Sequence, residues 1–214
     1  MNKLKTILFF LAPLIWSCSS TIEDQKKERL LPIYGEKKLS GEAGSTDTLF
    51  HQIGNFSFTN QYGESVDQSI TQDKIYIADF FFATCQSICP KMSTQLTRLQ
   101  DSIMSQNDVI ILSHTVNPMH DTVEVLKIYG EKYRAKKGKW HLLTGDRKEI
   151  YSLAKNDYLV NALEDNESDE GFLHSELFLL VDKQKRVRGL YDGTDSLQVD
   201  KLIRDLKILK SEKE

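Results

Sequence analysis

The sequence predicts an α/β domain in which helices cover both faces of a mixed central sheet. Two observations favour this class. Apolar runs rich in β-forming residues alternate along the chain with segments whose apolar residues recur at helical intervals. The chain also ends in a hairpin followed by a helix. Alternating strands and helices favour helices on both faces of the sheet, and the closing hairpin makes that sheet mixed.

The first half of the domain contains a hairpin, two buried strands and a helix between them. Residues 56–66, FSFTNQYGESV, alternate apolar and polar side chains as a hairpin does. Residues 74–82, KIYIADFFF, form an apolar run that predicts a strand buried on both faces. Residues 90–105 predict a helix, and Pro90 suits its first turn because no backbone N–H is needed there. A second buried strand follows at 109–112, VIIL.

The second half continues the alternation of helices and strands. Helices are predicted over residues 121–133, 146–154 and 196–209, and strands over 140–143, 175–181 and 187–191. The polar turn DKQKR joins the last two strands into a second hairpin. The acidic stretch 164–170, EDNESDE, is typical of a solvated loop.

The N-terminal segment is typical of a secretory signal that ends at a lipid attachment site. Two lysines precede an apolar run that ends at Trp16 and is too short to span a bilayer. Residues 14–18, LIWSC, resemble the lipobox of bacterial lipoproteins, whose cysteine becomes the lipidated first residue of the mature protein. We expect residues 1–17 to be a lipoprotein signal peptide and Cys18 to be lipidated. The alternative is an incidental cysteine beside an ordinary cleavage site.

The composition of the chain after the signal peptide predicts a tether followed by one domain. Residues 18–47 are polar and charged, which predicts a flexible tether ahead of a domain over 48–214. The protein then lies in the cell envelope, anchored to a membrane and facing the periplasm or the exterior. The formal net charge of -3 gives no basic field, so we expect no nucleic-acid partner.

Two of the three cysteines lie close together where a predicted strand meets a predicted helix. Cys85 and Cys89 stand between the strand at 74–82 and the helix opened by Pro90. The N–H groups and partial positive charge of a helix N-terminus stabilise thiolates, which bind metal and attack disulfides. Cysteines four residues apart share one helical face, within reach of a Cys85–Cys89 disulfide or of one soft metal ion. Copper(I), zinc and iron–sulfur chemistry all remain open for two thiolates.

A redox-active copper ion held by two sulfurs calls for a nitrogen donor, and the chain has five histidines. His174 is the strongest candidate, because it directly precedes the apolar run SELFLLVD, which predicts a central strand. Ordinary surface or packing roles are expected for His51, His114, His120 and His141. Met92 and Met119 carry thioethers, but Met92 falls on the apolar stripe of its helix and is expected in the core.

Four segments, in order, resemble the Sco/SenC family of copper-binding, thioredoxin-like proteins, and the resemblance extends over residues 56–209. The C-x-x-x-C-P element appears as CQSICP at 85–90, directly after DFFFAT. The S-x-x-P-x-x-D-T-x-x-x-L element appears as TVNPMHDTVEVL, with Thr115 in place of the usual serine. The W-x-x-L-T-G segment lies at 140–145, and His174 corresponds to the histidine before an apolar strand.

The resemblance implies a thioredoxin-like fold in which the strand after His174 begins opposite the cysteines. It implies that Cys85, Cys89 and His174 bind copper as Cu(I) or Cu(II). It also implies a metallochaperone role in building the dinuclear copper centre of cytochrome c oxidase. The partner would be the copper-centre subunit of that oxidase or another copper acceptor. Some family members are thought to act instead as thiol–disulfide reductases or redox sensors, with thiol redox partners.

The residues of the candidate site favour copper binding over the other two possibilities, an oxidoreductase and a structural disulfide. His174 favours the copper role, because disulfide exchange does not require a histidine there. The C-x-x-x-C spacing has one residue more than the C-x-x-C pair usual in reductases, which counts against an enzymatic oxidoreductase. A purely structural disulfide would close too short a loop to stabilise the domain much. Copper(I) and a disulfide compete for the same thiolates, so oxidation of the pair would release the metal.

Overall fold

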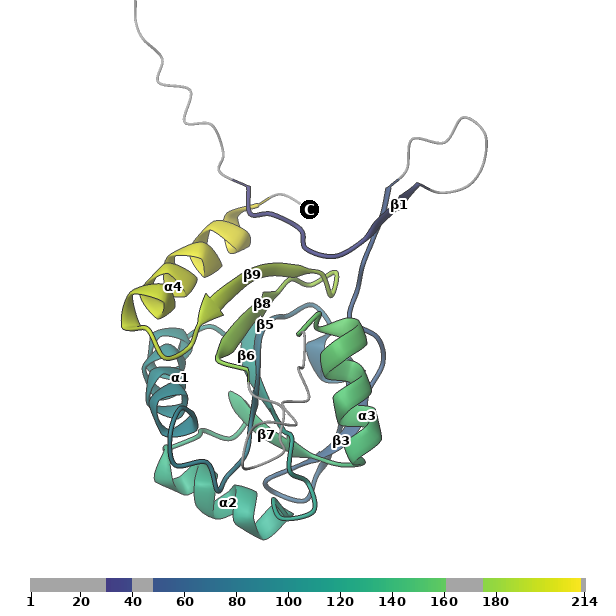
Figure 1. Ribbon diagram of the computed structural model, residues 1–214. Helices are drawn as coiled ribbons and strands as arrows, with labels where there is room; N and C mark the ends of the chain where they lie inside the picture. Colours follow the sequence, from purple (N-terminus) through teal and green to yellow (C-terminus); the bar gives the residue numbers. More distant parts are fainter. Residues whose placement is uncertain (1–29, 40–47, 161–174, 213–214) are drawn as a thin grey trace, which may run out of the picture.

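The computed structural model describes residues 30–39, 48–160 and 175–212, and a seven-stranded mixed sheet forms its centre (Figure 1). The strand order is β4-β3-β7-β6-β5-β8-β9. The signal peptide, Cys18, the acidic stretch 164–170 and His174 lie outside the described residues. Within the described ranges, no helix is both long enough and apolar enough to cross a bilayer.

Three parallel strands form the middle of the sheet: β5 (Ile75–Phe81), β6 (Val109–Thr115) and β7 (Trp140–Thr144). The flanking strands are antiparallel: β3 (Ser57–Asn60), β4 (Ser65–Asp67), β8 (Leu177–Val181) and β9 (Val187–Asp192). Every residue of β5 and β6 is buried, as the apolar runs 74–82 and 109–112 predict, and β6 continues beyond its run through the buried polar residues 113–115. Both predicted hairpins are therefore present, and the sheet is mixed as expected.

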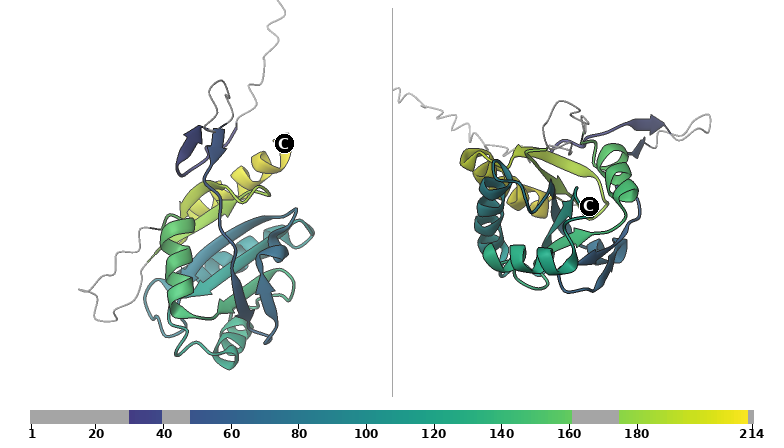
Figure 2. Two further views of the ribbon diagram at one scale, coloured as in Figure 1. Left: turned by 90° about the vertical axis from the view of Figure 1, so that its right-hand side faces the viewer. Right: turned by 60° about the horizontal axis from the view of Figure 1, so that its bottom comes forward.

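Helices cover both faces of this sheet. α1 (Cys89–Ile103) and α4 (Ser196–Ser211) lie side by side on one face, and α3 (Arg147–Ser152) lies on the other (Figures 1 and 2). α2 (Val123–Lys132) follows β6 and contacts β7. The predicted helix 146–154 ends in a π-helical turn, Leu153–Asp157.

Side-chain caps set where these helices begin. Thr122 accepts a hydrogen bond from the Val125 N–H, so α2 begins at residue 123 rather than at the predicted residue 121. Asp146 and Asp195 cap α3 and α4 in the same way. α1 has no side-chain cap, but a proline occupies its first turn. The first turn of α1 thus leaves backbone N–H groups for other acceptors.

The described part of the predicted tether contacts the domain. We call residues 30–39 the N-terminal strap. Leu31 is buried, and the Tyr34 N–H donates to the Val187 carbonyl at 2.9 Å, which fastens the strap to the beginning of β9. The end of the strap forms β1 (Lys37–Leu39), which pairs antiparallel with β2 (Thr48–Phe50). Composition predicts a flexible segment here, whereas the structure shows specific contacts.

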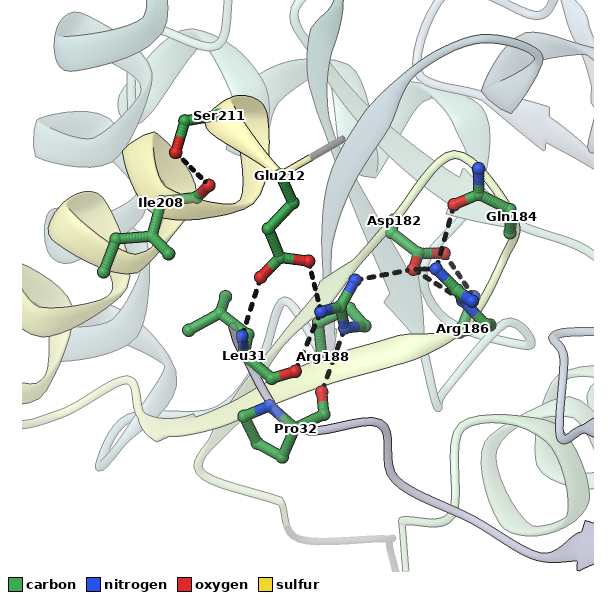
Figure 3. Close-up of polar contacts among 9 residues, drawn as sticks. All are labelled: Leu31, Pro32, Asp182, Gln184, Arg186, Arg188, Ile208, Ser211 and Glu212. Carbon is green, nitrogen blue, oxygen red and sulfur yellow. Dashed lines mark hydrogen bonds and ion pairs between the residues drawn. The ribbon is translucent and has the colours of Figure 1, made fainter. Parts of the chain in front are cut away.

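Arg188 holds the strap in place (Figure 3). Its guanidinium donates to the carbonyls of Leu31 at 2.8 Å and Pro32 at 3.0 Å. It also pairs with Asp182 at 3.1 Å and Glu212 at 2.5 Å, and its side chain is only 5% exposed. Glu212 in turn accepts from the Leu31 N–H at 2.7 Å. Because guanidinium carries five donors, a buried arginine needs such a set of acceptors, and the strap supplies two of them.

Candidate metal centre

The two thiols meet at the first turn of α1. The chain leaves β5 through residues 82–88, which we call the cysteine loop, and the Cys85 N–H donates to the Phe82 carbonyl at 3.2 Å. The Cys89 N–H then donates to Sγ of Cys85 at 3.4 Å. Both cysteines are free thiols and nearly buried, at 5% and 2% exposed. A free N–H of the helix terminus therefore points at one of the two sulfurs.

The two thiols differ in acidity although they lie together. Burial raises the pKa of the Cys85 thiol, but hydrogen bonds from Cys89 and Ser87 outweigh burial, so this pKa lies below its ordinary value. Burial strongly raises the pKa of Cys89, and a hydrogen bond with the Phe82 backbone offsets only part of that rise. Cys89 therefore keeps its proton, and Cys85 is the thiol that ionises more readily.

A buried carboxyl group lies under this site on β5. Asp79 accepts a short hydrogen bond from the Ser113 hydroxyl, which itself accepts from Nε1 of Trp140 at 2.8 Å. Burial raises the pKa of Asp79 to about 7, and its charge contributes to the raised pKa of Cys89. Asp79 is not among the predicted site residues, although it stands out in the sequence as the one acidic residue in the apolar run 74–82.

Asp121 ties the cysteine loop to the loop between β6 and α2. Its carboxylate is fully buried and accepts from the Ala83 N–H at 3.0 Å and from the Thr115 hydroxyl through a short hydrogen bond. Its second oxygen lies 2.9 Å from Nδ1 of His120. Thr115 stands where the Sco/SenC-like motif usually has serine, and it keeps a hydroxyl that donates to Asp121. The motif TVNPMHDT thus supports the cysteines from a neighbouring strand.

The third predicted ligand, His174, lies outside the described residues. The register of β8 bears on its neighbourhood. β8 pairs antiparallel with β5, with Leu179 opposite Ala78 and Val181 opposite Tyr76. The beginning of β8 therefore lies toward the end of β5 from which the cysteine loop departs. His174 precedes β8 by three residues in the sequence.

The other histidines and methionines considered as ligands differ in burial and in hydrogen bonding. His51 bonds to the Asp157 carbonyl through Nε2 at 2.7 Å, and His114 and His141 are buried. Met92 is buried in the core, whereas Met119 is exposed. Within the described ranges, no three His, Cys, Asp or Glu side chains converge on one point. The described donor set is thus two sulfurs, which suits a soft metal ion such as copper(I).

Comparisons with known proteins agree with this arrangement. The SCO1/SenC family model matches residues 45–210. A SCO1/SenC family lipoprotein from Bacillus anthracis str. Ames is 29% identical, with a TM-score of 0.68 over 75% of this chain and 96% of that chain. BsSco, described as having a disulfide switch and belonging to the Sco family of cytochrome c oxidase assembly proteins, is 30% identical. Its TM-score is 0.65 over 76% of this chain and 95% of that chain.

A copper-bound relative has the same fold. Copper-bound ScoI of Arabidopsis thaliana is 27% identical, with a TM-score of 0.60 over 74% of this chain and 98% of that chain. These likenesses confirm the thioredoxin-like fold class that the sequence predicts. Because the family model spans most of the domain and the four sequence motifs lie within it, the chain belongs to the SCO1/SenC family.

Proposed function

We propose that this protein carries one copper ion on Cys85, Cys89 and His174 and delivers it to the dinuclear copper centre of cytochrome c oxidase. The observation that carries this proposal is the pair of free thiols at the N-terminus of α1, joined by the hydrogen bond from Cys89 to Cys85. Related proteins support it, because Arabidopsis thaliana ScoI has been solved with copper and BsSco belongs to a family of oxidase assembly proteins.

The pKa values of the two thiols determine which cysteine binds copper first. Cys85, whose pKa is lowered, offers the first thiolate, and Cys89 must give up its proton before it can bind. Capture of copper(I) by both sulfurs therefore releases protons to solvent. A neutral imidazole at His174 would complete the set and would matter most for copper(II), which favours nitrogen donors.

The protein performs this task from a membrane, through a lipid on Cys18. The lipobox-like LIWSC motif and the lipoprotein relative from Bacillus anthracis support the anchor. It leaves the domain in the cell envelope, facing the periplasm or the exterior. Cys18→Ser should abolish incorporation of labelled fatty acid into the full-length protein. Equal labelling of the wild type and the variant would rule out Cys18 as the lipid anchor.

A thiol–disulfide role is the second candidate, favoured by the unequal acidity of the two thiols. The Cys85 thiolate would attack a partner disulfide and form a mixed disulfide. Cys89 would then attack Cys85, release the partner as a dithiol and leave a Cys85–Cys89 disulfide, so two electrons pass to the partner. BsSco is described as having a disulfide switch, which supports this chemistry in a relative.

Copper content of the reduced protein tests the first proposal. The mature chain with Cys18→Ser should hold about one copper(I) per molecule with sulfur ligands. Cys85→Ser and Cys89→Ser should each abolish tight binding, because no described neighbour supplies another soft, charged ligand. If either single variant kept full copper at unchanged affinity, the site would have to lie elsewhere. Thiol exchange without any copper binding in the wild type would favour the second candidate.

A further inference from the structure

Two soft donor side chains stand next to the cysteine loop and take no part in the site described above. Met119 and His120 lie in the loop between β6 and α2. Met119 is 86% exposed, more than any other large apolar side chain in the described ranges. The His120 imidazole is 51% exposed. By contrast, both cysteine thiols are nearly buried, so Met119 and His120 are more open to a copper donor in solution than the sulfurs of Cys85 and Cys89 are.

The imidazole of His120 is held in the form that a metal requires. The carboxylate of Asp121 accepts on both oxygens, from the Ala83 N–H, from the Thr115 hydroxyl and from the His120 ring. Because an ionised carboxylate only accepts, Nδ1 of His120 donates to it, and in the neutral ring Nε2 is then the nitrogen with the lone pair. A carboxylate behind the ring is the usual support of a metal-binding histidine, since it fixes the tautomer and the orientation.

The same carboxylate places His120 beside the cysteines. Nδ1 of His120 and the backbone N–H of Ala83 bond to opposite oxygens of Asp121, at 2.9 and 3.0 Å. Ala83 lies in the cysteine loop, two residues before Cys85. His120 therefore reaches the base of this loop through one carboxyl group. Other described histidines lack this arrangement, because His51 uses Nε2 in a hydrogen bond and His114 and His141 are buried.

We propose that Met119 and His120 form a copper(I) capture site that passes the ion to Cys85 and Cys89. The inference rests on the proposed copper function and adds a first binding step to it. A thioether and an imidazole bind copper(I) as neutral, soft donors, more weakly than two thiolates do. Transfer therefore runs toward the cysteines. Copper(I) leaves the Met119 sulfur and His120 Nε2, bonds to the sulfurs of Cys85 and Cys89, and keeps its oxidation state, while any proton still on either thiol passes to solvent.

Silver(I) binding in a cysteine-free background tests the capture site directly. Silver(I) is a redox-inert substitute for copper(I), and NMR of the methionine methyl groups reports thioether binding. In the full mature chain with Cys18, Cys85 and Cys89 changed to serine, silver(I) should shift the Met119 methyl and the His120 ring signals. Met119→Leu or His120→Asn should each weaken this binding by about tenfold or more. Met104→Leu is the matched control, because Met104 is also exposed but lies at the far end of α1.

Transfer kinetics test the role of the site in loading. With Cys85 and Cys89 intact, Met119→Leu should slow uptake of copper(I) from a bicinchoninate complex by about tenfold or more, because the variant loses one of the two proposed ligands of the capture site. Met119→Leu leaves the bond between His120 and Asp121 in place, so slower uptake in this variant cannot come from a disturbed cysteine loop. Met104→Leu should load at the wild-type rate.

The outcomes separate this inference from the proposed function. Silver(I) binding lost with Met119→Leu, together with slower copper(I) loading, supports the capture site. Unchanged silver(I) binding and unchanged loading in Met119→Leu would overturn it and would leave Met119 as an apolar contact. Failure of the intact, reduced protein to bind copper(I) tightly would overturn the proposed function, and the silver(I) result would then still report whether Met119 and His120 bind a soft cation.

Discussion

Asp121 accepts a hydrogen bond from the backbone N–H of Ala83 at 3.0 Å, so a buried carboxylate after β6 holds the loop that carries Cys85 and leads into Cys89. These residues lie 38 positions apart in the sequence. The carboxylate has three donors around it and no contact with solvent. The position of the thiols therefore depends on a side chain that would not itself touch the metal.

Asp121→Asn should disturb the cysteine loop. The Ala83 N–H and the Thr115 hydroxyl share one oxygen of Asp121, so an amide oxygen could keep both donors, with its NH2 group turned toward His120. The hydrogen bonds would then be made to a neutral group instead of a charged one, at a cost of about 1–3 kcal/mol in the free energy of unfolding. Copper(I) affinity should fall by about tenfold. Urea unfolding and competition with a copper(I) chelator would measure the two effects. Asp101→Asn is the control, because Asp101 is exposed on α1; affinity equal in both variants would contradict the role of Asp121.

His174→Ala should separate copper handling from thiol chemistry. Loss of the proposed nitrogen donor should weaken copper(II) much more than copper(I), which two thiolates can hold. The Cys85–Cys89 disulfide should still form and exchange. In cells that lack the native gene, the variant should fail to restore oxidase activity at limiting copper, and added copper should restore part of it by mass action. His51→Ala should restore activity fully, and a fully active His174→Ala would refute the chaperone proposal.

Asp79 and His114 should give opposite pH dependences of stability in the reduced, metal-free protein. Burial raises the pKa of Asp79 from 3.8 to about 7, so the folded state holds this proton longer and stability falls as pH rises from about 4 to 7. Burial among aromatic rings lowers the pKa of His114 from 6.5 to about 3, so stability falls as pH drops from about 6.5 to 3. In the wild type the two effects oppose each other between about pH 4 and 6.5.

Single variants should expose each effect. Asp79→Asn should leave the His114 dependence alone, so stability should rise with pH between about 4 and 6.5. Between pH 4 and 8, the free energy of unfolding of Asp79→Asn should rise by at most about 4 kcal/mol relative to that of the wild type. His114→Phe fits a site lined by Phe58 and Phe80 and should leave the Asp79 dependence alone. Urea unfolding across this pH range measures both slopes, and identical slopes in all three proteins would contradict the assignment.

Arg188→Met should release the N-terminal strap. The change removes the buried ion-pair partner of Glu212 but leaves Asp182 paired with Arg186, so it should cost about 3 kcal/mol in the free energy of unfolding. The Tyr34 amide, bonded to Val187 in the native fold, should exchange its hydrogen faster. Arg98→Met is the matched control, since its pair with Asp200 is exposed and should contribute about 0–1 kcal/mol. Protection of Tyr34 unchanged by Arg188→Met would contradict this view of the strap.

The sequence predicts those parts of the fold that local patterns determine. The buried strands β5 and β6 follow from unbroken apolar runs, and α1 follows from the helical spacing of its apolar residues after Pro90. The placement of Cys85 and Cys89 at a helix N-terminus follows from the same patterns. Their role as copper ligands, and that of His174, stays a prediction.

Long-range contacts lie beyond such patterns. Nothing local to Leu31 indicates that it meets Arg188, which is 157 residues away. Likewise, Asp121 lies in a polar turn, and only the parallel pairing of β5 and β6 brings it to Ala83. The raised pKa of Asp79 depends on burial from both faces of the sheet, which its apolar neighbours hint at but do not quantify.

Arg188 clasps the N-terminal strap at the opposite end of the sheet from the cysteine loop. Val187 pairs with Val181, and Val181 lies opposite Tyr76 at the beginning of β5, whereas the cysteine loop leaves from the end of β5. Seven residues of strand separate these two ends by roughly 20 Å. With a lipid on Cys18, the bilayer pulls on one pole while the thiols occupy the other. The thiols would then face the aqueous space, away from the bilayer, and would reach acceptors that project from the membrane.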